Sequence, residues 1–504
     1  EREIPELAAR GSWYRHRQTG AEVLSVETRD ENKVFGVTFR TPPADGTGLP
    51  HILEHAVLCG SRKYPVKEPF VEILKGSLQT FLNAFTYPDK TCYPVASQNL
   101  KDFYNLVDVY LDAVFYPRLS PHIFSQEGWH YELENEEGPL AVGGVVLNEM
   151  RGAHASPERQ LGVWSQKSLF PDTPYGFDSG GDPEEIPRLT YEKFIRFHRT
   201  FYHPSNARFF FYGDDDPEKR LSIVHEYVKD FRRRDVPSGV SLQRPFSSPR
   251  RVVRPFPAGN GGTAAPRGFM TVNWLLSETG DVDLNLAFHV LSHILVGMPA
   301  SPLRKALIDS GLGEDLASSG LEGELKQIFF SVGLRGMDPG REKELETLIF
   351  GTLDRLVRDG IDPATVEASL NTVEFRLREN NTGTYPRGLV LMLRALTTWL
   401  YDGDPFLLLS FEGPLAALRS ALEKNPRHFE ELIERWLVNN RHRSTVLLVP
   451  EEGLARKEEQ AREDALRQEL GRMDSEERAG VVAETETLRE AQNTPDRPED
   501  LATI

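Results

Sequence analysis

The sequence HILEH at residues 51–55 constrains this chain more than any other feature. Residues three and four positions apart lie on one face of a helix, so His51 and His55 would project side by side, with Glu54 next to them. The surrounding positions 52, 53 and 56–58 are apolar, which indicates a buried helix. Such a helix needs a reason to carry two histidines and a carboxylate, because buried polar groups destabilise a fold unless they are paired or bind a metal.

This spacing is typical of a zinc site with a neighbouring general base. Neutral imidazoles at His51 and His55 suit Zn²⁺, and Glu54 can take a proton from a water that the metal has made more acidic. The pattern HxxEH is the signature of the inverzincins. The alternative is a pair of core histidines beside a surface glutamate. With 13 histidines in 504 residues, chance rarely produces the pattern, which favours the metal site.

A third zinc ligand is expected, because a catalytic zinc usually has three protein ligands and one open position. Glu149 follows an apolar segment at a predicted junction between a strand and a helix, where a buried carboxylate would need compensation. His154 is a weaker alternative. The remaining candidates lie in an acidic run that is typical of a solvated turn: Glu132, Glu134, Glu136 and Glu137. The residues therefore favour Glu149.

The composition limits the class of protein and its partners. The chain has 504 residues, of which 39% are hydrophobic, enough for two or more globular domains. A net charge of −17 argues against nucleic acid as a partner. The two cysteines, Cys59 and Cys92, are too few for a disulfide framework and fit a reducing compartment. No apolar run approaches the roughly 18 residues of a membrane span, and no secretory signal is recognisable at the start. We therefore expect a soluble intracellular protein without a membrane span.

The order of predicted strands and helices favours an α+β fold with two similar units. The first unit is expected over residues 1–245, because composition shifts to proline, serine, glycine and arginine over 235–262. The second unit is expected over 262–450. Residues 451–504 consist mainly of charged helix formers, so they predict either a helical hairpin that links this part to something else or a partly disordered tail.

The second unit repeats the order of strand, loop and a helix with two histidines. His289 and His293 are four residues apart, but Ser292 stands where the first unit has its glutamate. We interpret this either as a duplication whose second copy has no catalytic chemistry or as two unrelated core histidines. In both cases this pair lacks a base, and we expect no metal there.

Longer stretches of the chain resemble the presequence protease branch of the pitrilysin-like M16 metallopeptidases. They are HILEHAVLCGSRKYP at 51–65, KGS at 75–77, NAFTYPD at 83–89, QEGWHYEL at 126–133, NEM at 148–150, ASPLRKAL at 300–307 and SGLG at 310–313. The resemblance covers essentially the whole chain. It implies that His51, His55 and Glu149 bind one zinc ion per chain and that Glu54 is the general base.

The resemblance also implies where a substrate binds. Asn83, Ala84 and Phe85 belong to a predicted strand over residues 80–86, to which an unstructured peptide would add as an extra strand. The alternative for Asn83 is an asparagine that simply marks a bend in the strand.

The fold and function that the resemblance implies are specific. We expect two M16-type αβ domains, each a mostly antiparallel sheet covered by helices, in a zinc endopeptidase that degrades unstructured peptides, such as targeting presequences, inside a closed chamber. Complete members are about twice as long, so the expected partner is a C-terminal half, joined covalently or present as a second chain. A bacterial cytoplasm and an organelle matrix both fit. The alternatives are a non-catalytic scaffold or binding subunit and, less well supported, a hydrolase that acts on other substrates.

Overall fold

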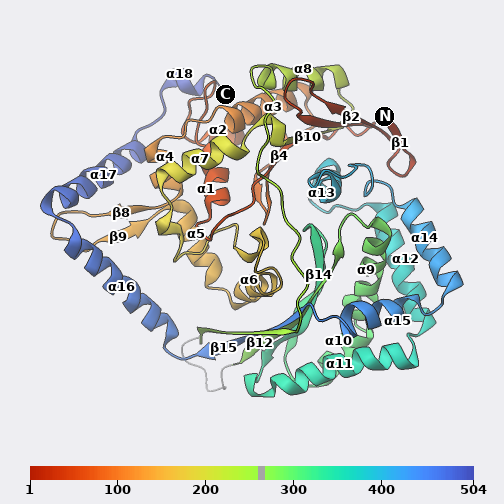
Figure 1. Cartoon of the computed structure of the whole chain (residues 1–504). Helices are drawn as coiled ribbons and strands as arrows, with labels where there is room; N and C mark the ends of the chain where they lie inside the picture. Colours follow the sequence, from red (N-terminus) through yellow and green to blue (C-terminus); the bar gives the residue numbers. More distant parts are fainter. Residues whose placement is uncertain (259–266, 504) are drawn as a thin grey trace.

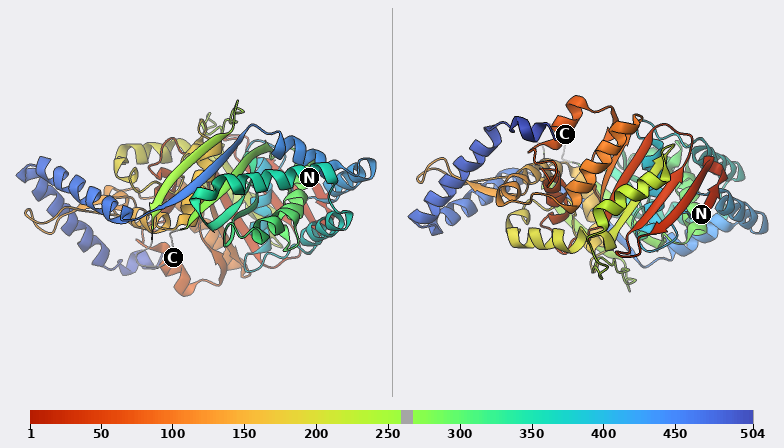
Figure 2. Two further views of the ribbon diagram at one scale, coloured as in Figure 1. Left: turned by 90° about the horizontal axis from the view of Figure 1, so that it is seen from below. Right: turned by 90° about the horizontal axis from the view of Figure 1, so that it is seen from above.

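The computed structural model describes residues 1–258 and 267–503 (Figure 1). Two sheets covered by helices form the body of the molecule, and a long helical hairpin extends from one side of it (Figure 2). The described residues therefore have the expected α+β fold class. The expected start of the second unit at residue 262 lies outside the described residues.

The first sheet has eight strands, and most of its neighbouring strands are antiparallel. In spatial order they are β1 (Arg2–Ile4), β2 (Ala9–Arg15), β3 (Glu22–Glu27), β10 (Ala207–Gly213), β4 (Lys33–Arg40), β7 (Lys90–Ser97) and β5 (Gln79–Leu82), with β6 (Phe85–Thr86) also paired to β7. Only β3 and β10 pair in parallel among these described strands. Strands β5 and β6 therefore lie at one edge of the sheet.

Helices α1 and α5, which carry the expected metal ligands, belong to a group of helices in the first part of the chain. They are α1 (Leu49–Val57), α2 (Pro69–Gly76), α3 (Leu100–Phe115), α4 (Pro121–Glu127), α5 (Val145–His154), α6 (Pro157–Leu169), α7 (Tyr191–Phe201) and α8 (Pro217–Val228). One face of the first sheet shares a hydrophobic core with α1, α3, α7 and α8. Helix α3 begins after Asn99, whose side chain accepts hydrogen bonds from two backbone N–H groups of the first turn.

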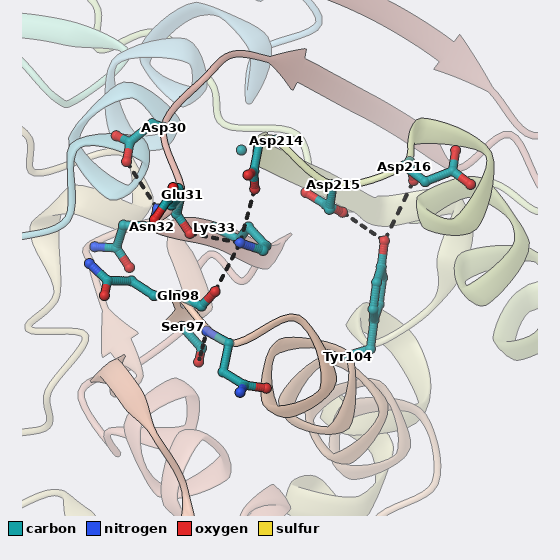
Figure 3. Close-up of polar contacts among 12 residues, drawn as sticks. Asp30, Glu31, Asn32, Lys33, Ser97, Gln98, Tyr104, Asp214, Asp215 and Asp216 are labelled. Atoms are coloured by element: carbon teal, nitrogen blue, oxygen red, sulfur yellow. Dashed lines mark hydrogen bonds and ion pairs between the residues drawn. The ribbon is translucent and has the colours of Figure 1, made fainter.

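A buried lysine fixes the end of strand β4 (Figure 3). Nζ of Lys33 donates hydrogen bonds to the carbonyl oxygens of Glu31 (2.7 Å) and Gln98 (3.0 Å) and lies 2.9 Å from a carboxylate oxygen of Asp214. A buried ammonium group requires such partners. Because Gln98 follows β7 and Asp214 follows β10, this lysine ties together the ends of three neighbouring strands.

The second sheet has five strands. In spatial order they are β11 (Arg250–Pro257), β15 (Arg443–Glu451), β12 (Gly268–Glu278), β14 (Gln327–Met337) and β13 (Asp315–Glu322). Only β11 and β15 are parallel. Strand β11 lies within residues 235–262, where the shift in composition predicted a boundary between the two units, and its pairing with β15 places residues 250–257 in the second sheet. Pairing with β15 along all eight residues outweighs the local proline and arginine content.

Helices cover one face of the second sheet. They are α9 (Val282–Ser292), α10 (Pro302–Asp309), α11 (Glu342–Asp359), α12 (Pro363–Glu379), α14 (Glu412–Lys424) and α15 (His428–Ile433), and they share one hydrophobic core with it. The stretch Val282–Asp309 is long and apolar enough to cross a membrane by length and composition alone. Since 61% of its most apolar window is buried in the protein, it is weak evidence for a span, because core helices pass the same test.

The two parts of the chain exchange helices. Helix α13 (Arg387–Trp399) lies against the second face of the first sheet, where Leu396 packs in one cluster with Phe210 of β10. Conversely, α6 lies against the second face of the second sheet, where Leu161 packs against Val446 and Leu448. Each sheet is thus enclosed between its own helices and one helix from the other part.

The charged C-terminal segment forms a helical hairpin, which is one of the two alternatives that its composition left open. Its helices are α16 (Leu454–Arg472) and α17 (Ser475–Asn493), followed by the short α18 (Pro498–Leu501). The turn lies at Met473 and Asp474, and Asp474 forms a capping box with Glu477. Gly480 lies inside α17 and does not interrupt the helix.

Candidate metal centre

His51, His55 and Glu149 converge at one point. The two histidines lie one turn apart on α1, and Oε2 of Glu149 on α5 lies 3.7 Å from Nε2 of His51 and 3.6 Å from Nε2 of His55. One ligand atom from each residue lies within 4.8 Å of the others, and no second group of this kind occurs in the described part of the chain. Tetrahedral zinc at about 2.05 Å from its ligands holds them about 3.4 Å apart, so this donor set fits zinc after small side-chain adjustments.

Hydrogen bonds orient both imidazoles with Nε2 toward Glu149. Nδ1 of His51 lies 3.0 Å from the carbonyl oxygen of Gly180, to which it donates. Nδ1 of His55 lies 3.2 Å from Oε2 of Glu127, a buried residue at the end of α4. Partners of this kind fix the tautomer and the ring orientation of metal ligands. Both Nε2 atoms therefore remain available for a metal.

Glu127 contacts a candidate ligand, and the sequence pattern alone did not predict this contact. Burial raises the pKa of Glu127, but hydrogen bonds with His55 and Gln126 outweigh burial and hold this pKa below its usual value. Burial lowers the pKa of His55, and the hydrogen bond with Glu127 reverses this, so the pKa of His55 is raised. Glu127 lies in QEGWHYEL, one of the stretches on which the family resemblance rests. Its contact with His55, however, joins distant segments and cannot be seen in the sequence.

Glu54 is buried beside the two histidines. Burial raises the pKa of Glu54 above its usual value, although Thr86, His51 and His55 act in the opposite direction. A carboxylate with a raised pKa suits a group that accepts a proton and then returns it. Glu54 therefore has the position and the chemistry of a general base.

The surroundings of Glu149 differ from those predicted from the sequence. The apolar residues before it belong to helix α5 rather than to a strand, since strand β9 (Ala141–Gly143) ends earlier. Its side chain is also 54% exposed, so burial is not the reason for its position. The alternatives lie elsewhere: His154 pairs with Asp178 (3.2 Å) and Glu132 pairs with His130 (3.0 Å).

A cavity of about 640 Å³ joins this group to the edge of the first sheet. Its lining includes the three ligand candidates, Glu54, residues 83–88, and side chains of α6. The strand expected over residues 80–86 is interrupted between β5 and β6. Oδ1 of Asn83 accepts a hydrogen bond from the backbone N–H of Ala84 (2.9 Å), as the alternative of a strand bend predicts. Asn83, Ala84 and Phe85 nevertheless line the cavity at the sheet edge.

Comparison with known proteins gives the family. Residues 40–150 match the family model "Insulinase (Peptidase family M16)", and residues 188–373 match "Peptidase M16 inactive domain". A crystal structure of a protease from Helicobacter pylori has the same fold, with a TM-score of 0.69 at 17% identity, and it covers 88% of this chain and 100% of that chain.

Two curated relatives match the chain over almost its full length. Presequence protease 1, chloroplastic/mitochondrial, of Arabidopsis thaliana is 52% identical over 99% of this chain and 47% of its own length. Protein HypA of Clostridium perfringens is 45% identical over 99% of this chain and 52% of its own length. The chain spans about half the length of these relatives. From the two family matches and this similarity it follows that the chain belongs to the M16 peptidase family.

Proposed function

We propose that this chain is the catalytic half of a zinc-dependent endopeptidase that degrades unstructured peptides. The observation that carries the proposal is the convergence of His51, His55 and Glu149 on the cavity that Glu54 also lines. These three residues would hold the zinc ion through Nε2, Nε2 and a carboxylate oxygen. The resemblance to presequence proteases supports peptides as the substrate class.

Different residues of the chain contribute to different parts of peptide hydrolysis. A bound zinc ion supplies a Lewis acid that polarises the scissile carbonyl and makes a water molecule more acidic. Glu54 takes the proton from the attacking water and returns it to the leaving amine, for which its raised pKa is suited. Glu127 and the carbonyl group of Gly180 keep the imidazoles of His55 and His51 in place.

The substrate would bind in an extended conformation. The backbone next to Asn83, Ala84 and Phe85 lies at the sheet edge and lines the cavity, so a peptide added there as a further strand passes the metal ligands. We propose that a second half, joined covalently or as a separate chain, closes the chamber around it, since the relatives are about twice as long.

We propose the following division of the chain. Residues 1–245 form the catalytic domain, 262–450 form a non-catalytic domain, and 451–504 form a linker toward the second half. The match of residues 188–373 to a family model described as inactive supports a non-catalytic role for the second domain. A chloroplastic/mitochondrial relative and a bacterial relative support an organelle matrix or a bacterial cytoplasm as the compartment.

The experiment combines metal analysis with peptide hydrolysis. We expect about one zinc ion per wild-type chain, and cleavage of a fluorogenic unstructured peptide by the chain together with its second half. Glu54→Gln should keep the zinc and lose hydrolysis by roughly 100-fold to 10,000-fold, because a general base contributes about that much. Glu137→Gln, at an exposed position outside the cavity, is the matched control and should keep both.

Two outcomes would contradict the proposal. Full turnover by Glu54→Gln would remove this residue from its role. A wild-type chain that binds zinc but cleaves no peptide with its second half would favour the alternative, a scaffold or binding subunit with an M16 fold.

A further inference from the structure

The two carboxylates next to the histidines are attached to one two-stranded ribbon. Strand β8 (His130–Glu132) pairs antiparallel with β9 in a sheet of their own. Helix α4, which ends at Glu127, leads into β8. Strand β9 leads into α5, which carries Glu149. A shift of this ribbon would therefore move the partner of His55 and the third candidate ligand together.

The base of the ribbon is packed without a gap. Gly144 has φ +144°, and a Cβ atom there would lie 2.1 Å from the carbonyl oxygen of Gly128. Only glycine permits this approach and this backbone conformation. The segment after Glu127 and the segment before Glu149 thus touch backbone to backbone, and the ribbon transmits its position to both.

The far end of the ribbon is held by helix α17. In Figures 1 and 2 the ribbon extends from the body of the molecule to the helical hairpin. Thr485 and Leu488 are the buried residues of α17, whereas no residue of α16 is buried. The backbone N–H of Leu133, next to β8, donates a hydrogen bond to Oγ1 of Thr485 (3.1 Å) in a buried setting. An otherwise charged helix therefore places its buried contact on the ribbon.

The C-terminal end of α17 and the residues after it contact the segment that follows α1. Nζ of Lys67 donates a hydrogen bond to the carbonyl oxygen of Ala491 in α17, and the backbone N–H of Lys67 lies 3.2 Å from a carboxylate oxygen of Asp496. Lys67 lies in the segment between α1, which carries both histidines, and α2. Helix α17 thus bridges the segment after the histidines and the ribbon that leads to Glu127 and Glu149.

We propose that α17 positions the metal centre through the β8–β9 ribbon, with Thr485 as its positioning residue. This inference rests on the proposed metal site and adds a role for the helical hairpin beyond that of a linker. Removing the contact leaves the three ligands in the chain but allows Glu149 and Glu127 to move away from the histidines. The affinity for zinc should fall as a result.

The test is the zinc affinity of the whole chain, measured by competition with a chromogenic chelator. Thr485→Val keeps the side-chain shape and removes the acceptor for the N–H of Leu133. We expect about tenfold weaker zinc binding, the lower end of what outer partners of metal ligands contribute. Thr487→Val is the matched control, because the hydroxyl of this exposed residue bonds only within its own helix, to the carbonyl oxygen of Ala483. Its zinc affinity should equal that of the wild type.

Further variants separate the hydrogen bond of Thr485 from a general effect on folding. Thr485→Ser retains the hydroxyl and should restore wild-type affinity; equal weakening by serine would overturn the role of the hydrogen bond. If Thr485→Val does not fold, Thr485→Ala, which also removes the acceptor, decides in its place, with the same expected weakening. A lower melting temperature with unchanged zinc affinity would show a merely structural contact and overturn the inference alone. A wild-type chain that binds no zinc would overturn both the metal site and the inference.

Discussion

Nδ1 of His55 lies 3.2 Å from Oε2 of Glu127, a carboxylate 72 residues later in the chain. The contact joins the helix of the HILEH sequence to the end of α4, and its carboxylate is 6% exposed, which keeps water from competing for the imidazole. The direction of one candidate ligand therefore depends on a residue outside the group of candidate ligands.

Loss of this carboxylate should weaken metal binding. Glu127→Ala leaves Nδ1 of His55 without its partner, and we expect zinc affinity to fall by about 10-fold to 100-fold. Glu127→Gln retains an acceptor oxygen and should lose less. Chelator competition measures both. Equal affinities for the wild type and Glu127→Ala would contradict the role given to this contact.

The close approach at Gly144 predicts a strongly position-dependent effect of alanine in this region. Gly144→Ala should destabilise the protein by about 2 kcal/mol or more, because the backbone is strained for any other residue and Cβ meets the backbone of Gly128. Gly152→Ala in the same helix has nothing within 4 Å of its new Cβ, and it should stabilise by about 0.5–1 kcal/mol. Urea denaturation followed by circular dichroism measures both changes, and similar effects of the two variants would contradict the packing described.

The exchanged helix α13 should contribute to the stability of the first sheet. Leu396 is 1% exposed, and Leu396→Ala should cost about 2–5 kcal/mol of unfolding free energy. Leu407, which is 39% exposed, provides the control, and its replacement by alanine should change stability by less than about 0.5 kcal/mol. Midpoints of urea unfolding report both. An unchanged midpoint for Leu396→Ala would mean that α13 does not hold the sheet.

A partly buried histidine next to the first core, His198, predicts loss of stability in mild acid. Burial lowers the pKa of His198 from 6.5 to about 4. Between these values the unfolded chain binds more protons at this residue than the folded chain, so stability falls as pH decreases from 6.5 toward 4. The contribution is on the order of 2 kcal/mol by pH 5.

Replacing this histidine tests the assignment. In the folded protein Nε2 of His198 donates to the carbonyl oxygen of Val114 (3.0 Å), and the amide of a glutamine can donate in its place. His198→Gln should therefore flatten the dependence of unfolding free energy on pH, while His122→Gln at an exposed position should leave it as in the wild type. An unchanged slope in His198→Gln would assign the acid sensitivity to other groups.

Much of the fold follows from local pattern. The helix that carries residues 51–55 and the helices of the charged segment 451–504 were predicted, because local patterns of apolar or charged residues indicate them. Strand β11 was missed because proline and arginine dominate its composition, and it exists through pairing with β15. Pairing with a strand that is distant in the sequence cannot be predicted from the local composition.

The candidate site shows the same division. His51, Glu54 and His55 could be named from spacing on a single helix, whereas Glu149 needed the resemblance to a known family as well. Glu127 escaped notice because its significance lies entirely in a contact with His55. Site residues that share one face of a helix can be predicted from a single sequence. Residues that act through contacts between distant segments cannot.

The crossing of α6 and α13 has a consequence for biosynthesis. A ribosome completes the strands of the first sheet long before it reaches Arg387, so the sheet face around Phe210 emerges without its cover. Exposed apolar strands of this kind associate with other nascent chains. During synthesis this apolar face therefore stays uncovered until α13 has left the exit tunnel.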